Sequence, residues 1–269
     1  MANGSTERKT GARKLEVRDL TMGFGDRTVL RDISLTADRG ELVGILGVSG
    51  SGKTTLFNCI AGLYVPRAGQ VLLDGEDITG TTGRISYMLQ KDLLLPHKTI
   101  EDNVALPLVI GGRGKKEARA FAGEHFARFG LEGTEKLYPS QLSGGMRQRA
   151  ALLRTYLFSD DVALLDEPFS ALDTITKGKM HRWYMEVMER IRLTTLFITH
   201  DIDEAILLSD RVYILTGSPG QIRGEFAVDR PRGERQGYEL SEEFLKIKRQ
   251  IVAVLDGQEC LRDGENVVE

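Results

Sequence analysis

The stretch GVSGSGKTT, from Gly47 to Thr55, places small residues, a lysine and two hydroxyls directly after an apolar run. It fits the pattern G-x-x-x-x-G-K-[ST], with Gly47, Gly52, Lys53 and Thr54 at the fixed positions. Glycines let successive backbone N–H groups point inward, and these amides, with the N-terminus of the next helix, form a cradle for phosphate oxygens. Lys53 is expected to reach the β- and γ-phosphates of a nucleotide, and the Thr54 hydroxyl to take a magnesium position.

A flexible turn between a strand and a helix is the competing interpretation of this stretch. The apolar run before it and the helical pattern TTLFNCIAGL after it are the context that a phosphate-binding loop requires, and they favour phosphate binding. The predicted nucleotide contacts in this loop are Gly47, Ser49, Gly50, Ser51, Gly52, Lys53, Thr54 and Thr55.

An acidic pair follows a second apolar run, since Asp166 and Glu167 come directly after VALL. A P-loop needs a metal-holding acid on a neighbouring strand, and α/β sheets bind ligands at the carboxyl ends of their strands. Adjacent side chains on a strand point to different sides, so the two acids can have separate roles. Asp166 is predicted to help hold magnesium through water, and Glu167 to polarise the attacking water. The competing interpretation, a solvated loop start, is disfavoured by the P-loop upstream.

A sheet must position these residues. Short apolar runs predict buried strands at ELVGILG, VALLDEP, TTLFIT and RVYILT, with RVYILT as the last core strand. LEVRDL and DISLTA alternate as antiparallel strands do, and QVLLDGEDI predicts a hairpin that turns at Asp74-Gly75. The pattern from about residue 91 to 158 is helical. The sequence therefore predicts an α/β fold with a parallel core sheet, an N-terminal antiparallel β subdomain and an inserted helical subdomain.

Composition limits the classes of function. Of the 269 residues 41% are hydrophobic and 28% charged, with a net charge of −3, which is typical of a globular protein and argues against a general nucleic-acid binder. Cys59 and Cys260 are the two cysteines, too far apart in sequence to suggest a disulfide framework. No signal-peptide or membrane-spanning run is found, so a membrane role is expected to come from a partner. We expect one domain over residues 14–256, between a disordered tail at 1–13 and a flexible tail at 257–269.

A third motif, LSGGMRQR at 142–149, lies just before the acidic strand. With it the chain resembles the ATPase subunits of ABC transporters over about residues 15 to 215. Further motifs of that family lie in the right order along the chain: the aromatic Phe24 in MGFG, Gln90 in ISYMLQ, the D-loop Ser170-Ala171-Leu172-Asp173, and His200 in FITHD.

The resemblance implies a role for each matched residue. The implied catalytic residues are Glu167, His200, Gln90 and Lys53. The implied magnesium ligands are Thr54, Gln90 and Asp166. Phe24 is implied to stack on adenine. The signature residues Ser143, Gly144 and Gly145 begin a helix, and would meet the γ-phosphate of an ATP held by the opposite subunit, so that a head-to-tail homodimer encloses two ATP molecules.

The resemblance also implies partners: transmembrane permease subunits, which would hold the chain at the cytoplasmic face of the membrane, and indirectly an extracytoplasmic substrate-binding protein, but no nucleic acid. The apolar segment Asp92 to Pro96 is either core or part of a groove for a coupling helix of the membrane subunit. The final helix, Ser241 to Leu255, is expected to pack on its own core, with Leu240 and Leu245 as a hydrophobic staple.

One signature position departs from the family, because Met146 stands where glutamine is usual. LSGGMRQR together with ALPL at 105–108 resembles the nitrate, sulfonate and thiamine-precursor branch of bacterial importers, so the ATPase of a small-solute importer is the first interpretation. An exporter ATPase is the alternative. A non-transport relative acting on DNA or ribosomes is disfavoured by the single ATPase unit, and a P-loop kinase by the LSGGM motif. The transported solute is not predicted.

Overall fold

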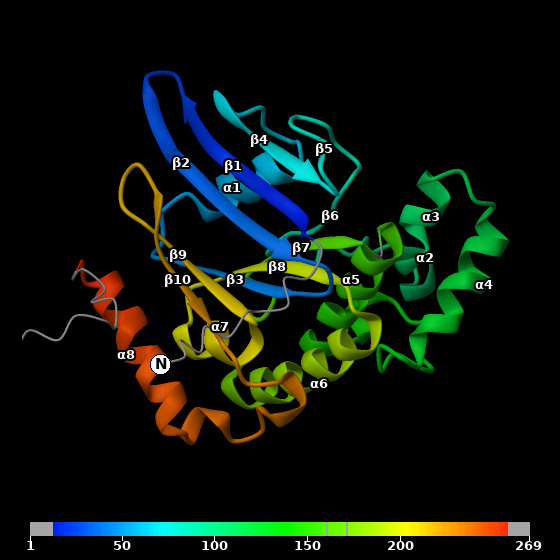
Figure 1. Ribbon diagram of the computed structural model, residues 1–269. Coiled ribbons are helices and arrows are strands. Elements are labelled where there is room, and N and C mark those ends of the chain that lie inside the picture. The colour runs from blue at the N-terminus through cyan, green and yellow to red at the C-terminus, as the bar shows by residue number, and fades with distance from the viewer. Residues whose placement is uncertain (1–12, 160, 171, 258–269) are drawn as a thin grey trace, which may run out of the picture.

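The computed structural model describes residues 13–159, 161–170 and 172–257 (Figure 1). The two expected tails fall almost entirely outside these ranges, as do Ala171 of the D-loop motif and Cys260. Within the described ranges, no helix has both the length and the apolar character that a membrane crossing requires.

The larger sheet has six strands in the order β10-β9-β3-β8-β7-β6. Its strands are β3 (Leu42–Leu46), β6 (Ser86–Met88), β7 (Val162–Asp166), β8 (Thr194–Thr199), β9 (Arg211–Thr216) and β10 (Gln221–Ala227). All neighbours are parallel except β10, which pairs antiparallel with β9. Every residue of β3, β7 and β8 is buried, which explains why these strands are mostly apolar in sequence. RVYILT, predicted as the last core strand, is β9, and the partly exposed edge strand β10 that follows it was not predicted.

The smaller sheet is antiparallel, in the order β2-β1-β4-β5, and confirms the predicted N-terminal β subdomain. Its strands are β1 (Arg13–Phe24), β2 (Arg27–Asp38), β4 (Ala68–Leu73) and β5 (Glu76–Asp77). Helix α1 (Lys53–Ile60) follows β3, and its buried side chains share one apolar core with both sheets. The helix that begins at the P-loop is therefore fixed between the two sheets (Figure 1).

A group of helices separates β6 from β7 along the chain and lies to one side of the sheets in Figure 1. Its elements are α2 (Ile100–Val104), α3 (Leu106–Ile110), α4 (Lys115–Phe126), the 3-10 turn η1 (Pro139–Gln141) and α5 (Gly144–Phe158). These helices share a second apolar core with α6 (Thr174–Ile191), which contributes Met180, Tyr184 and Met188. Met88 of β6, Leu165 of β7 and Phe197 of β8 belong to the same core, so the inserted helices pack directly on the larger sheet as well as sharing this core with α6.

The C-terminal part of the chain closes a third core. After α7 (Ile202–Leu208) and β9–β10 come two 3-10 turns, η2 (Arg232–Glu234) and η3 (Tyr238–Leu240), and then α8 (Glu242–Leu255). Phe244, Ile251 and Val254 of α8 are buried against α7, β9 and β10, which confirms that this helix packs on its own core. Ser241 caps α8 as expected, but Leu240 is 84% exposed, so the predicted hydrophobic staple does not form.

Candidate active site

Three positions in the loop between β3 and α1 accept only glycine without strain. Gly50 and Gly52 have φ values of +83° and +96°, in the region that glycine alone enters readily. A Cβ on Gly52 would lie 2.7 Å from Leu30 Cδ2, and a Cβ on Gly47 would lie 2.1 Å from the carbonyl oxygen of Leu215. The glycine spacing of the motif is thus required by close packing as well as by φ.

Lys53, the first residue of α1, is 7% exposed and bends back over this loop. Its Nζ donates to the carbonyl oxygens of Gly47 at 2.8 Å and Val48 at 3.0 Å. Burial lowers the pKa of Lys53 from its ordinary value, although the charges of Glu167 and Asp166 oppose this. The buried hydroxyl of Ser51 has no hydrogen-bond partner among the described residues. A buried cation, an orphan hydroxyl and a helix N-terminus without acidic residues are a donor set that fits phosphate.

Thr54 and Asp166 were predicted to share a metal, and the structure brings them together. Thr54 Oγ1 donates to Asp166 Oδ2 at 3.0 Å, and Asp166 is 6% exposed at the end of β7. Burial raises the pKa of the Asp166 carboxyl above its ordinary value, while the Thr54 hydrogen bond opposes the rise. Among the described residues no three His, Cys, Asp or Glu side chains form a metal cluster. The two oxygen ligands fit Mg²⁺, which commonly takes one or two protein ligands and completes its shell with phosphate and water.

Glu167 receives contacts from two other loops. Its Oε2 lies 3.2 Å from Gln90 Nε2, and its Oε1 lies 3.2 Å from His200 Nδ1. Gln90 follows β6 and His200 follows β8, so side chains after three neighbouring strands converge on one carboxylate. Glu167 has φ +47°, a left-handed conformation unusual for glutamate. The structure thus brings together three of the four predicted catalytic residues, and its hydrogen bond points the Gln90 amide nitrogen toward Glu167.

The signature residues lie elsewhere. Ser143 caps α5 by accepting a hydrogen bond from the backbone N–H of Met146 at 3.3 Å. In the part of the chain that the structure describes, no hydrogen bond or ion pair joins Ser143, Gly144 or Gly145 to the P-loop. The unusual Met146 packs on the core of the inserted helices, where an apolar side chain suits its surroundings.

The predicted adenine contact, Phe24, lies at the turn between β1 and β2 and is 49% exposed. Its ring meets that of Tyr64 edge to face, with centroids 5.4 Å apart. An exposed aromatic ring, held by a second ring, is available for stacking.

A buried ionic cluster behind His200 was missed by the sequence analysis. Glu204 is 3% exposed and accepts hydrogen bonds from Lys177 Nζ at 2.8 Å and His181 Nε2 at 3.3 Å. Lys177 also contacts Asp201, the residue after His200, at 2.7 Å. The acids after His200 were visible in sequence, but nothing there indicated which cation on α6 they meet.

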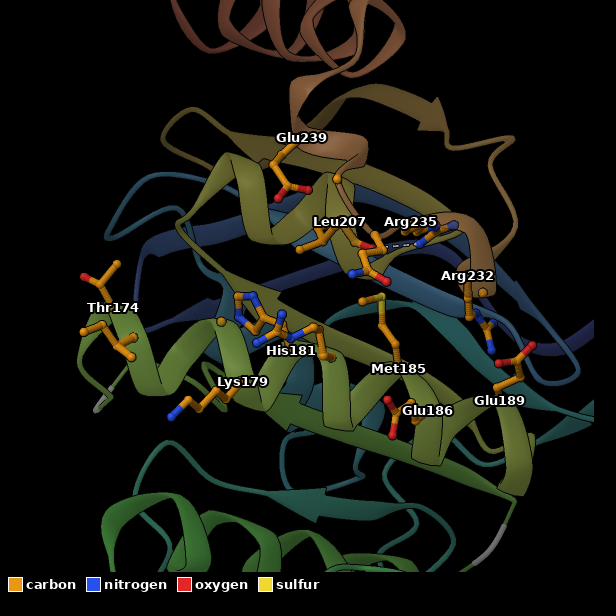
Figure 2. Close-up of a pocket in the computed structure, with 16 residues that line it drawn as sticks. Thr174, Lys179, His181, Met185, Glu186, Glu189, Leu207, Arg232, Arg235 and Glu239 are labelled. Carbon is orange, nitrogen blue, oxygen red and sulfur yellow. Dashed lines mark hydrogen bonds between the residues drawn. The ribbon is translucent and has the colours of Figure 1, made fainter.

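His181 also borders a cleft of about 460 Å³ between α6 and the segment that carries η2 and η3 (Figure 2). Side chains of both charges surround it, among them Lys179, Glu186, Arg232 and Glu239. None of its lining residues comes from the P-loop or the Glu167 cluster, so this cleft is separate from the candidate active site.

Comparison with known proteins identifies the family. Residues 30–170 match the family model described as ABC transporter. The formylaminopyrimidine import ATP-binding protein ThiZ of Halalkalibacterium halodurans is 47% identical over 231 residues, which cover 84% of this chain and 90% of that protein. The nitrate import ATP-binding protein NrtD of Synechocystis is 36% identical over 255 residues, covering 91% of this chain and 96% of that protein.

A solved structure agrees with these relatives. The dimeric ATP-binding cassette MJ0796, bound to ADP and phosphate in a post-hydrolysis state, superposes with a TM-score of 0.68 at 30% identity, covering 81% of this chain and 100% of that one. The fold and family predicted from the motifs are therefore confirmed. The chain belongs to the ABC transporter family and is one of its ATPases.

Proposed function

We propose that this chain is the ATP-hydrolysing subunit that powers import of a small solute through separate membrane permease subunits. The observation that carries the proposal is the convergence of Gln90 and His200 on Glu167, beside the Thr54–Asp166 pair and Lys53. Importer rather than exporter is supported by the names of the relatives, which are import ATP-binding proteins for a thiamine precursor and for nitrate.

In this proposal each residue has a stated task, and Gln90 has two. The loop amides and Lys53 bind the phosphates, and Phe24 stacks on adenine. Glu167 accepts the proton of the attacking water, while Gln90 and His200 orient that water and the carboxylate. Thr54 and Asp166, with Gln90, would hold Mg²⁺, which neutralises charge on the phosphate oxygens when bound.

The proposed active unit is a head-to-tail homodimer. Ser143 and its two glycines begin a helix of fifteen residues with no acid in its first turn, so they present free amides to an anion. Among the residues that the structure describes, no hydrogen bond or ion pair links them to the P-loop of their own chain, and the solved relative bound to ADP and phosphate is a dimer. The signature motif of one chain would therefore complete the phosphate site of the other.

A groove between the inserted helices and residues 61–87 supports docking of a permease helix. It has a volume of about 420 Å³, and exposed apolar side chains line it, including Leu63, Leu93, Ile110 and Phe158, of which Ile110 is 76% exposed. Both interpretations of the segment Asp92 to Pro96 have support, because Leu94 is 7% exposed while Leu93 is 52% exposed and lines this groove. A helix laid in this groove would hold the chain at the cytoplasmic face of the membrane, and the permease would receive its solute from an extracytoplasmic binding protein.

The Glu167→Gln variant tests the proposed chemistry. Glutamine keeps the size of the side chain and removes its basicity, and loss of a general base costs roughly 10²–10⁴-fold in rate. ATP binding should be retained, because the loop amides and Lys53, which bind the phosphates in this proposal, are unchanged. The matched control is Glu189→Gln, an exposed carboxylate on α6 that should leave the rate unchanged. A steady-state ATPase rate within about threefold of the parent chain would refute the role of Glu167.

A further inference from the structure

We propose that Arg147 and Arg154 of α5 are positioning residues that couple the apolar groove to the signature motif. This inference rests on the proposed function, and concerns how one of its surfaces acts on the other. Both arginines bind the short segment that follows Gln90, and they lie about two helical turns apart on the same face of α5.

Arg154 holds the backbone of this segment. Its guanidinium donates from Nη1 to the carbonyl oxygen of Leu93 at 2.9 Å, and from Nη2 to the carbonyl oxygen of Asp92. Arg154 also lines the groove, next to the side chain of Leu93. The same guanidinium therefore contacts the groove and the segment behind it.

Arg147 joins this segment to the signature motif. Its Nε lies 3.3 Å from Asp92 Oδ2, and its Nη1 donates to the carbonyl oxygen of Leu142 at 2.9 Å. Leu142 directly precedes Ser143, the cap of α5. A displacement of Asp92 is therefore transmitted to the backbone at Ser143 through a single side chain.

The segment is held in a conformation that its own residues disfavour. Leu93 has φ +46°, a left-handed value that costs a branched L-residue energy, yet its side chain is 52% exposed in the groove. Asp92 braces the turn by accepting the backbone N–H of Leu94 at 3.1 Å. The charges of α5 therefore maintain the strained turn, and a partner helix pressing on Leu93 acts directly on the carbonyl that Arg154 binds.

The same few residues also lead to the catalytic carboxylate, because Gln90 contacts Glu167. A helix seated in the groove would thus change two things together: the placement of Gln90 within its own chain, and the placement of Ser143 toward the partner chain. Coupling between binding sites is reciprocal, so ATP-driven engagement of Ser143 must alter the segment at the groove. This reciprocity allows a test without the permease.

The test compares Arg154→Met with Arg149→Met, both in a Glu167→Gln chain, where ATP should trap the dimer. Arg149 is the matched control, since it lies on the same helix but covers Trp183 and reaches Gly130 instead. Hydrogen–deuterium exchange of residues 92–98 is measured with and without ATP. We expect ATP to slow this exchange by at least about fivefold in the parent and in Arg149→Met, and not in Arg154→Met.

Two further measurements separate coupling from simple loss of structure. The affinity of the monomer for a labelled ATP analogue should be equal in both variants, while the ATP-dependent dimer of Arg154→Met should be roughly tenfold weaker by analytical ultracentrifugation. Arg154→Lys should recover part of the difference, because an ammonium reaches one carbonyl. Asp92→Asn, whose side chain is 28% exposed, should weaken the dimer in the same direction with little effect on folding.

The outcomes are distinguishable. Equal ATP-dependent exchange and equal dimer affinity in Arg154→Met and Arg149→Met would overturn the coupling and leave the proposed function intact. A parent Glu167→Gln chain that binds ATP but never dimerises would overturn the proposed head-to-tail site, and the coupling with it.

Discussion

Replacing Glu204 by alanine should destabilise the fold, because this carboxylate is the centre of the buried cluster behind His200. It is 3% exposed and binds Lys177 and His181, which both project from α6. His181 in turn meets the ring of Phe169 edge to face, with centroids 4.9 Å apart. The cluster therefore connects the helix that follows the D-loop with the loops that carry His200 and Glu167 (Figure 2 shows His181 on α6).

The magnitude follows from what remains after the substitution. Breaking a buried ion pair by removing one partner usually costs roughly 3–5 kcal/mol, because the other charge stays buried and unpaired. Lys177 is 20% exposed and keeps Asp201 at 2.7 Å, so we expect the lower end, about 3 kcal/mol. For a chain of this size that corresponds to a fall in Tm of about 6–12 °C.

The assay is thermal and urea unfolding of Glu204→Ala beside Asp203→Ala. Asp203 is the adjacent acid on α7, and its side chain is 55% exposed in its ion pair with Lys248. Loss of this pair should therefore lower the free energy of unfolding by at most about 1 kcal/mol. Equal Tm shifts in the two variants would refute the reasoning, since they would mean that burial and the second cation add nothing.

The pH dependence provides a second check. Burial raises the pKa of Glu204, but hydrogen bonds from His181 and Lys177, together with their charges, outweigh burial and bring the pKa below its ordinary value. A carboxyl with a depressed folded pKa stabilises the fold above its unfolded pKa, and this contribution is lost as pH falls through the folded pKa. The stability difference between Glu204→Ala and the parent should therefore be the same at about pH 7 and about pH 5, and shrink at more acidic pH. A difference that grows on acidification would contradict the pairing.

Three further predictions concern the nucleotide site and the last helix. Gly52→Ala, whose new Cβ would lie 2.7 Å from Leu30 Cδ2 at φ +96°, should weaken binding of a labelled ATP analogue at least about tenfold, whereas Gly178→Ala, with open space around it, should not. Phe244→Ala should lower the free energy of unfolding by roughly 3–5 kcal/mol in urea titrations while leaving ATP affinity unchanged, since this ring anchors α8 in the third core and is not one of the predicted nucleotide contacts. Mixing Lys53→Ala chains with Ser143→Arg chains should recover ATPase activity that each lacks alone, because one of the two composite sites then carries neither lesion; a mixture as inactive as its components, although mixed dimers form, would count against the shared site.

The fold was predictable where burial alone decides structure. VALLDEP and TTLFIT became β7 and β8 because a strand buried on both faces is rich in apolar residues, with only threonines and the terminal Asp166 as polar members. The strand β10 was missed because QIRGEFA is only partly buried and contains a glycine, so it carries neither a continuous apolar run nor a clean alternation. Its pairing with β9 depends on the hairpin between them and on the position of β9 in the sheet. No local sequence pattern predicts that position.

The site was predictable where spacing fixes geometry, and unpredictable where long side chains meet across the fold. The P-loop and the acidic pair are contiguous residues, and the strand order places Thr54 against Asp166. Arg154 and Glu204 gave no such signal, because an arginine or glutamate on a helix usually faces solvent. Their partners lie 61 and 27 positions away along the chain, and only the packing of α5 and α6 selects them.

The two groups of contacts differ in how rigidly they are held, and this difference supports separate control of ATP binding and dimer formation. Glu167 and its partners follow β6, β7 and β8, whose positions are fixed by ladders of backbone hydrogen bonds in a buried sheet. Ser143 is placed by α5, whose polar links to the Gln90 segment are the flexible side chains of Arg147 and Arg154. Because side-chain contacts yield before a buried sheet does, a force in the groove should shift the signature motif toward or away from the partner's ATP while the P-loop keeps its shape. In the proposed transporter, a permease would then regulate completion of the proposed shared site without changing how tightly each chain holds its own nucleotide.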